Sequence, residues 1–151
     1  MIKTAEATRR AALVENPSVI EAAPAARFTG PSACTSGHLR AVDHAFLRRA
    51  VECGVRLGYA GDIDRDGLII AAQVRDLYGA RLYAMDAAAV ASARPSAVPL
   101  GRLPDGTPHD LATALAEEGT AVYQEADAIL NLLLGGRSAE PTGEPEGHRT
   151  G

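Results

Sequence analysis

Three aspartates on alternate positions, Asp62, Asp64 and Asp66, come directly after the apolar run 55–60. Carboxylates this close repel one another unless a cation or hydrogen-bond donors neutralise them. A hard divalent metal such as Mg²⁺ is the obvious neutralising partner, because it prefers oxygen ligands. In enzymes, an Asp-x-Asp metal site of this kind supports phosphoryl transfer.

Two other interpretations of this acidic segment stay open. Acidic residues favour turns and helix N-termini, so the segment is also compatible with a solvated turn that caps the next helix. A calcium-binding EF-hand loop fits residues 62–69 in part. Its twelfth position is Gln73, which cannot act as a bidentate carboxylate, and the run before Asp62 has a strand pattern where an EF-hand needs a helix.

The elements before these acids have the pattern of buried strands. The run 55–60 is short and contains Val, Leu and Tyr, which is typical of a strand in the core. The run 11–14 is also short and apolar, and it ends at Glu15, ahead of a helix whose first turn suits Pro17. Glu15 and Asp62 therefore occupy equivalent positions, each at the carboxyl end of a buried strand, where open parallel sheets bind ligands.

The rest of the chain repeats this strand-then-helix order. Further strands are expected at 32–35 and 80–85, with a short edge strand at 121–123. Helices are expected at 18–23, 38–53, 68–78, 87–94, 107–118 and 124–134. The pattern predicts an α/β fold of the Rossmann-like, doubly wound kind: a four-stranded parallel sheet flanked by helices, with a C-terminal helical extension.

The predicted strand order brings the acids together. If the order is 2-1-3-4, the strands that end at Glu15 and Asp62 are neighbours about 4.8 Å apart. Their exit loops then flank the topological switch point of the sheet. Asp62 and Asp64 face the same side if the chain stays extended between them. Glu15, Asp62 and Asp64 would then converge on one Mg²⁺.

These segments resemble the Toprim family of topoisomerases, primases and nucleases. The signature is a strand ending in Glu, here residues 13–15, and a later apolar strand ending in Asp-x-Asp-x-x-Gly, here residues 59–67. A closer likeness is to the Toprim-like C-terminal domain of the JetD-type nuclease subunit of bacterial Wadjet anti-plasmid systems. The segments that carry this likeness are 14–17, 34–37, 61–67 and 122–125. The resemblance covers residues 11–134.

The resemblance implies a Toprim fold and Mg²⁺-dependent DNA cleavage, with Mn²⁺ as a substitute cofactor. It implies that Asp62 and Asp64 are metal ligands and that Glu15 is a ligand or the general acid/base. Asp66 lies outside the core Toprim pattern and is an additional candidate ligand or a helix cap. The implied partners are DNA and SMC-like subunits of the defence complex, and the resemblance is compatible with a homodimer.

A second function class also fits the sequence. A non-catalytic Toprim-fold module that docks onto an SMC-like partner would suit the small size and the acidic charge, whereas intact Glu15, Asp62 and Asp64 favour catalysis. A phosphatase-like or receiver-like domain is a weaker alternative, because the chain has no Asp-x-Asp-Gly-Thr motif. Wadjet proteins of this type carry a long region before the domain, so we expect a fragment, a split gene product or a remnant, with DNA presented by a missing region or by partner subunits.

Length and composition set the outer bounds. With 151 residues, 46% of them hydrophobic, the chain is long enough for one domain with a real core. The expected division is an N-terminal stump at 1–10, the domain at 11–134 and a disordered tail at 135–151. A formal net charge of −4 argues against a surface that binds polyanions throughout.

The same composition bears on location and on three lesser candidates. No apolar run reaches membrane-spanning length and no signal peptide is visible, so we expect a cytoplasmic protein without a membrane partner. Cys34 and Cys53 are expected to be buried free thiols. Among the lesser candidates, His38 is most simply a residue at a helix start, Arg65 fits a carboxylate or a DNA contact equally, and Glu125 fits an exposed position.

Overall fold

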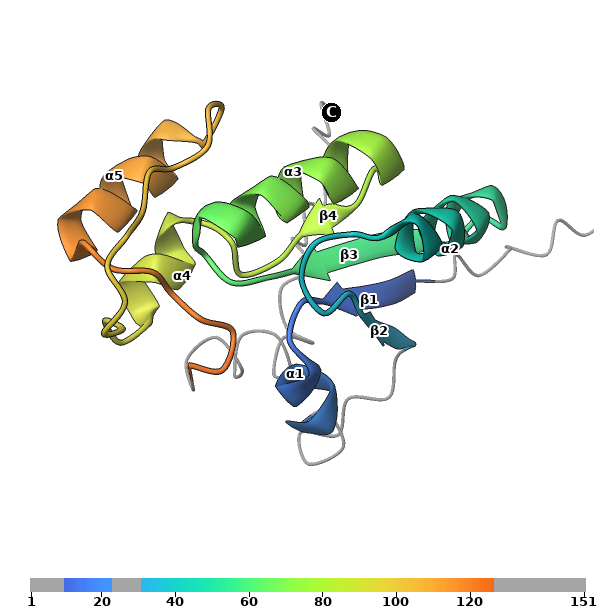
Figure 1. Ribbon diagram of the computed structural model, residues 1–151, viewed down its shortest axis with the longest axis horizontal. Coiled ribbons are helices and arrows are strands. Elements are labelled where there is room, and N and C mark those ends of the chain that lie inside the picture. The colour runs from blue at the N-terminus through green and yellow to red at the C-terminus, as the bar shows by residue number, and fades with distance from the viewer. Residues whose placement is uncertain (1–9, 23–30, 127–151) are drawn as a thin grey trace, which may run out of the picture.

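The computed structural model describes residues 10–22 and 31–126 of the chain. Its elements are β1 Arg10–Val14, α1 Pro17–Ala22, β2 Ser32–Cys34, α2 Ala41–Glu52, β3 Arg56–Ala60, α3 Arg65–Tyr78, β4 Arg81–Leu82, α4 Ala87–Ser92 and α5 His109–Glu118. The strands pair in parallel in the order β2-β1-β3-β4, as Figure 1 shows. The α/β, Rossmann-like class and the strand order predicted from the sequence are therefore confirmed.

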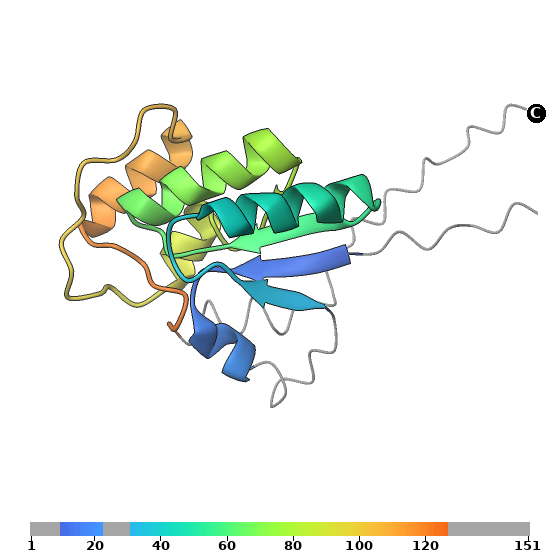
Figure 2. The same ribbon diagram turned by 45° about the vertical axis from the view of Figure 1, so that its right-hand side comes forward.

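Helices cover the sheet. The helices α2 and α3 pack against each other and against β3, and both views show them side by side along the sheet (Figures 1 and 2). The helix α1 lies on the side away from α3 in Figure 1. Side chains between these layers form one core, in which Leu13, Tyr59 and Val74 are buried. Burial of β1 and β3 explains why these central strands are nearly continuous apolar runs.

The helix ends follow local rules that the sequence already contains. Asp64 caps α3 by accepting a 2.8 Å hydrogen bond from the backbone N–H of Gly67. Asp86 caps α4 in the same way, accepting a 2.9 Å bond from Ala89. Gly79 terminates α3 in the left-handed conformation that glycine adopts without steric cost.

Three element boundaries differ from the prediction by three residues. The strand predicted over 80–85 keeps only Arg81–Leu82, because Ala84 has a positive φ of 52°, which ends the extended run. The helix predicted from residue 38 begins at Ala41, because Arg40 still has an extended backbone, with φ −93° and ψ 170°. The helix predicted from residue 68 begins earlier, at Arg65, because Asp64 caps it.

The segment after α5 also differs from the prediction. Instead of a strand at 121–123 there is a single antiparallel bridge between Val122 and Ile63. Gln124 and Glu125 form a turn, so the helix predicted over 124–134 does not begin at residue 124. Its remainder at 127–134, the N-terminal residues 1–9 and the predicted tail at 135–151 lie outside the described residues.

Both cysteines are free, but they are not both buried. Cys34 is partly buried, whereas Cys53 is exposed, which corrects the expectation of two buried thiols. Cys53 follows directly on the last turn of α2, and its exposed position shows that the helix ends at the surface. Within 10–22 and 31–126, no helix has the length and apolar character needed to cross a bilayer.

Candidate functional site

The two acid-bearing strand ends meet at the carboxyl edge of the sheet. Val14 of β1 pairs in register with Ala60 of β3, and the N–H of Glu15 donates a 3.2 Å hydrogen bond to the carbonyl of Ala60. One step further, the backbone N–H of Asp62 donates a 3.1 Å bond to Oε2 of Glu15. The Glu15 carboxylate therefore lies on the backbone of Asp62, 47 positions away in the sequence, as the predicted strand order requires.

Gly61 provides the space for this approach. A Cβ atom at Gly61 would lie 2.9 Å from Oε2 of Glu15 and 2.5 Å from the hydroxyl of Tyr59. Both oxygens therefore crowd the Cα atom of Gly61. Any side chain at this position would push the Glu15 carboxylate away from Asp62 or displace the Tyr59 ring.

Asp64 is held by the helix that follows it. Its backbone is extended, with φ −131° and ψ −175°, and Ile63 before it forms a β-bridge with Val122, as expected of an extended chain between Asp62 and Asp64. The helix cap that was considered for Asp66 is supplied by Asp64, which is the last non-helical residue and so can reach the N–H of Gly67. Because Gly67 has no side chain, the first turn of α3 can close against the carbonyl of Asp62.

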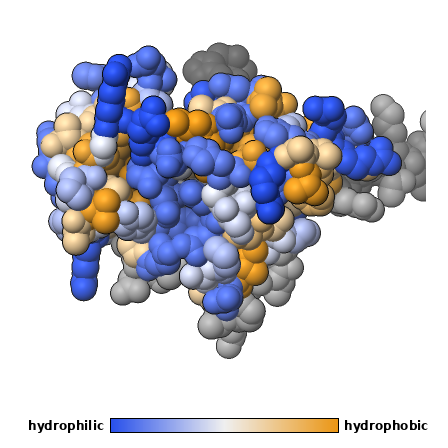
Figure 3. Space-filling model, in the orientation of Figure 1, coloured by the Kyte–Doolittle hydropathy of each residue, from blue (hydrophilic) through white to orange (hydrophobic). Residues whose placement is uncertain are grey.

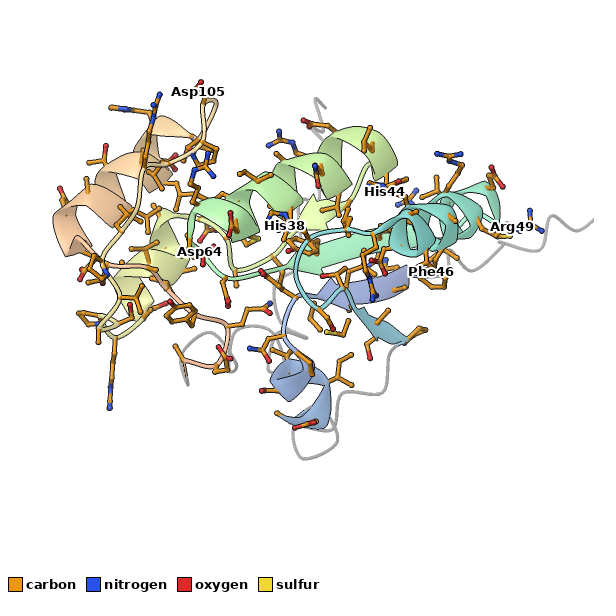
Figure 4. The ribbon with its side chains drawn as sticks, in the orientation of Figure 1. His38, His44, Phe46, Arg49, Asp64 and Asp105 are labelled. Atoms are coloured by element: carbon orange, nitrogen blue, oxygen red, sulfur yellow. The ribbon has the colours of Figure 1, made fainter. Side chains whose placement is uncertain are left out.

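Asp66 has a different surrounding from the other acids. It lies in the first turn of α3, and its Oδ1 is 3.7 Å from Nε2 of His38. Both side chains are about 60% exposed, so this pair contributes little to stability. Figure 4 shows His38 on the loop that faces the start of α3, near Asp64. His38 therefore belongs to the rim of the acidic site, and Arg65 is exposed beside it.

The segment 120–126 closes the site from a distant part of the sequence. The backbone N–H of Gln124 donates a 2.7 Å hydrogen bond to Oδ1 of Asp62, and its side-chain Oε1 accepts a 3.1 Å bond from the N–H of Asn16. Val122 and Ile63 exchange backbone hydrogen bonds of 2.7 and 3.1 Å. In Figure 1 this segment, drawn in orange-red, passes the carboxyl ends of the strands toward α1.

Gln124 is a site residue that the sequence did not single out. Its side chain is 0% exposed, although residues 124–134 have the pattern of a surface helix. One signal was present in the sequence, because residues 122–125 are among the segments on which the family resemblance was based. Glu125 is exposed, as expected, but it accepts a hydrogen bond from the side chain of Asn16 and so joins the same loop.

The site is electrostatically strained in its ionised form. Burial raises the pKa of Asp62 to about 6, and the negative charge of Glu15 adds to the rise, while the Gln124 N–H opposes it. Burial also raises the pKa of Glu15, against the lowering effect of the Asp62 N–H, and the charge of Asp64 raises it further. Burial and the same three acids raise the pKa of the Tyr59 hydroxyl, which therefore keeps its proton. A cation at this position would relieve the crowding of negative charge.

The donor set suits a hard cation, but it is not arranged as a finished metal centre. One carboxylate oxygen of each of Glu15, Asp62 and Asp64 accepts a hydrogen bond from a backbone N–H. The other oxygen of each carboxylate has no protein donor in residues 10–22 and 31–126. In that same part of the chain, no group of three His, Cys, Asp or Glu side chains is placed to hold a metal ion as it stands. Joint ligation by these oxygens therefore requires side-chain rotation, for which carboxylates at the rim of a site have room.

The surface around the acids is hydrophilic. Figure 3 shows polar side chains gathered over the middle of this face, where the carboxyl ends of the strands lie, and an apolar patch over α2. A shallow hollow elsewhere, between α2 and α3, contains none of the candidate acids; it is lined by His44, Arg48, Val51, Glu52, Leu77 and Tyr78. The candidate acids therefore lie at a polar edge of the sheet, outside this hollow.

Comparison with known proteins places this chain in a family. Among curated proteins none matches it. The model of a family described as "Protein of unknown function C-terminus (DUF2399)" matches residues 1–135, a span that contains Glu15, Asp62, Asp64 and Gln124. The chain belongs to the DUF2399 family.

Proposed function

We propose that this chain is a Toprim-like, Mg²⁺-dependent DNA-cleaving domain that hydrolyses or nicks phosphodiester bonds within a bacterial plasmid-defence complex of the Wadjet type. One observation carries the proposal: the 3.1 Å hydrogen bond from the Asp62 N–H to Oε2 of Glu15. It brings the glutamate at one strand end onto the Asp-x-Asp segment of the neighbouring strand. That juxtaposition is the one that the Toprim signature requires.

The metal would be held by carboxylate oxygens. Glu15, Asp62 and Asp64 are the candidate ligands for Mg²⁺ or Mn²⁺, because each keeps one oxygen that no described backbone donor engages. Asp66 is a weaker candidate, since its carboxylate lies near His38 on the exposed first turn of α3. When bound, a divalent cation supplies polarisation of the scissile phosphate and activation of water.

Glu15 would transfer protons, and backbone N–H groups would orient the two aspartates. The pKa of Glu15 is raised above its ordinary value, which is the direction that suits a carboxylate acting as an acid/base group. Asp62 is oriented by the N–H of Gln124, and Asp64 by the N–H of Gly67. Each hydrogen bond holds one oxygen of its aspartate and leaves the other oxygen for a cation.

The test is metal binding by charge-neutral variants. Calorimetry with Mn²⁺ should show affinity reduced about tenfold or more in Asp62→Asn and in Asp64→Asn, because each loses an anionic ligand. Asp66→Asn should lose less Mn²⁺ affinity. Asp76→Asn should bind Mn²⁺ as tightly as the wild type, because the exposed carboxylate of Asp76 pairs with Arg75. Unchanged affinity in both Asp62→Asn and Asp64→Asn would remove these residues from the proposed site.

A second candidate is a non-catalytic module that docks onto an SMC-like partner. The observation in its favour is the exposure of large apolar side chains on α2, with Val42 63% and Phe46 57% exposed, together with the lack of a finished metal centre among the described residues. Figure 4 shows where Phe46 lies on α2. If Asp62→Asn retains full plasmid defence in cells and Phe46→Ser abolishes it, the docking module is favoured over the nuclease.

A further inference from the structure

Tyr59 has a feature that packing does not explain. It is the bulkiest of the fully buried side chains in the described residues, with 0% of its surface exposed. Its hydroxyl has no hydrogen-bond partner in that part of the chain. Buried tyrosine hydroxyls usually find a partner, and an unpaired one is costly. Phenylalanine would fill the same space without this cost, so the hydroxyl calls for another explanation.

The position of the hydroxyl links it to Glu15. The Tyr59 hydroxyl oxygen and Oε2 of Glu15 lie 2.5 and 2.9 Å from one point, the place of a Cβ atom on Gly61. The carboxylate of Glu15 accepts a single described hydrogen bond, from the N–H of Asp62. A glutamate side chain has several rotatable bonds, so one bond to Oε2 does not fix its carboxylate plane.

The other two carboxylates are already oriented. Oδ1 of Asp62 is held by the N–H of Gln124, and Oδ1 of Asp64 by the N–H of Gly67. Glu15 is the acid whose oxygen crowds Gly61 together with the Tyr59 hydroxyl. A small rotation of the Glu15 carboxylate would bring an oxygen into line with the hydroxyl proton, whereas the buried ring of Tyr59 has little freedom to move.

We propose that Tyr59 is a positioning residue of the acidic site, whose hydroxyl donates a hydrogen bond to the Glu15 carboxylate and fixes its orientation for cation binding. The need for this orientation rests on the proposed function, while the hydrogen bond itself does not. Because the donor is neutral and buried, it steadies the carboxylate without competing with a cation for its negative charge. Such outer donors are known to set the affinity of carboxylate and histidine metal sites.

The first experiment is Tyr59→Phe with two measurements, Mn²⁺ affinity and stability. Mn²⁺ affinity by calorimetry should fall about 5- to 20-fold, because Glu15 loses its second donor. The urea midpoint of the metal-free protein should fall only slightly, because the variant loses one neutral hydrogen bond and leaves no buried donor behind. Tyr78→Phe is the control: its hydroxyl lies 2.5 Å from Nδ1 of His44, away from the acids, so Mn²⁺ affinity should not change. Wild-type Mn²⁺ affinity in a folded Tyr59→Phe protein would overturn the proposal.

The second experiment reads the hydrogen bond directly in the wild-type fold. Tyrosine is labelled with ¹³C at the ζ position for nuclear magnetic resonance. The Tyr59 signal is assigned by its absence in Tyr59→Phe or by through-space contacts. We expect this signal to shift on addition of Mg²⁺ and on Glu15→Gln. The Tyr78 and Tyr83 signals should not shift. No response of Tyr59 to either change overturns the proposal, even if Tyr59→Phe does not fold. If the wild type binds no Mn²⁺, the proposed function fails, and the response to Glu15→Gln alone then decides the inference.

Discussion

The backbone N–H of Gln124 donates a 2.7 Å hydrogen bond to Oδ1 of Asp62, 62 positions earlier in the sequence. The side-chain Oε1 of Gln124 also accepts a hydrogen bond from the backbone N–H of Asn16, which is next to Glu15. A single buried residue thus connects the loops after β1 and β3, which carry the two principal acids. The acidic site is therefore built from three separate segments of the chain, and its geometry depends on all three.

Replacing Gln124 should damage both stability and the site. In Gln124→Ala the N–H of Asn16 loses its buried acceptor, and we expect a loss of about 2–3 kcal/mol in the free energy of unfolding. Mn²⁺ affinity should fall as well, because residue 124 keeps its backbone bond to Asp62 but loses the side-chain bond that holds the loop of Asn16 and Glu15. The core substitution Leu115→Val, in the buried face of α5, is the control for stability alone. It should lower the free energy of unfolding measured in urea and leave the Mn²⁺ affinity measured by calorimetry unchanged.

Asp64 has two roles that substitutions can separate. Asn also caps helices well, so Asp64→Asn should keep the stability of the wild type while losing Mn²⁺ affinity. Asp64→Ala should lose both, with about 1 kcal/mol of unfolding free energy removed. Asp86→Ala removes the equivalent cap of α4 and should cost a similar amount without affecting metal binding. Equal Mn²⁺ affinity in Asp64→Asn and wild type would reduce Asp64 to a cap.

Gly67 should tolerate no side chain. A Cβ atom there would lie 1.9 Å from the carbonyl oxygen of Asp62, and this backbone atom cannot move without distorting the acid loop. We expect Gly67→Ala to lower the free energy of unfolding by about 3 kcal/mol or more, as overpacking against backbone does. Gly101→Ala is the matched control, since its Cβ would meet nothing within 4 Å. Thermal unfolding of both variants by circular dichroism would test this, and equal melting temperatures would contradict it.

The stability of the metal-free protein should depend on the ionisation of Asp62. Its pKa is about 6 in the folded state, compared with an ordinary value of 3.8, so protonation favours the folded form. The stabilising contribution is complete below about pH 4 and is lost as the pH rises through 6. A shift of two units corresponds to about 3 kcal/mol, which screening at this partly open site reduces to about 1–2 kcal/mol.

Urea unfolding at pH 5 and pH 7.5 measures this effect. The wild type should lose more stability between the two values than Asp62→Asn does, because asparagine does not ionise. Saturating Mg²⁺ should restore the stability of the wild type at pH 7.5. Its effect on stability should be smaller at pH 5, where protons compete with the cation for the carboxylates. An identical pH dependence in wild type and Asp62→Asn would show that Asp62 titrates normally.

The isolated chain should bind DNA weakly and cleave it poorly or not at all. Duplex binding relies on Lys and Arg that neutralise phosphates, and this chain has 15 basic residues against 19 acidic ones. We expect a dissociation constant no tighter than about 10 µM at physiological salt. Any nicking of plasmid with Mn²⁺ at low salt should vanish in Glu15→Ala. Robust Glu15-dependent nicking by the chain alone would contradict this prediction and reveal a self-sufficient nuclease.

The sequence by itself determined the parts that local rules control. The short apolar runs before Glu15 and Asp62 predicted two buried strands, and alternation of strands with helices predicted a parallel sheet. Glycine at position 79 predicted the end of a helix, which the left-handed backbone there confirms. Because parallel strands all end at one edge of a sheet, these local features place Glu15 and Asp62 at the same edge, and their contact follows once β1 and β3 are neighbours.

Only the tertiary structure decided how that edge is completed. The buried position of Gln124, the crowding of Tyr59 and Glu15 over Gly61 and the raised pKa of Asp62 all arise between segments far apart in the sequence. Burial depends on which segment covers a residue, and the amphipathic helix pattern of residues 124–134 did not predict that Gln124 would be enclosed. Periodicity reports which face of an element is apolar; contact between two distant loops depends on the packing of the whole chain.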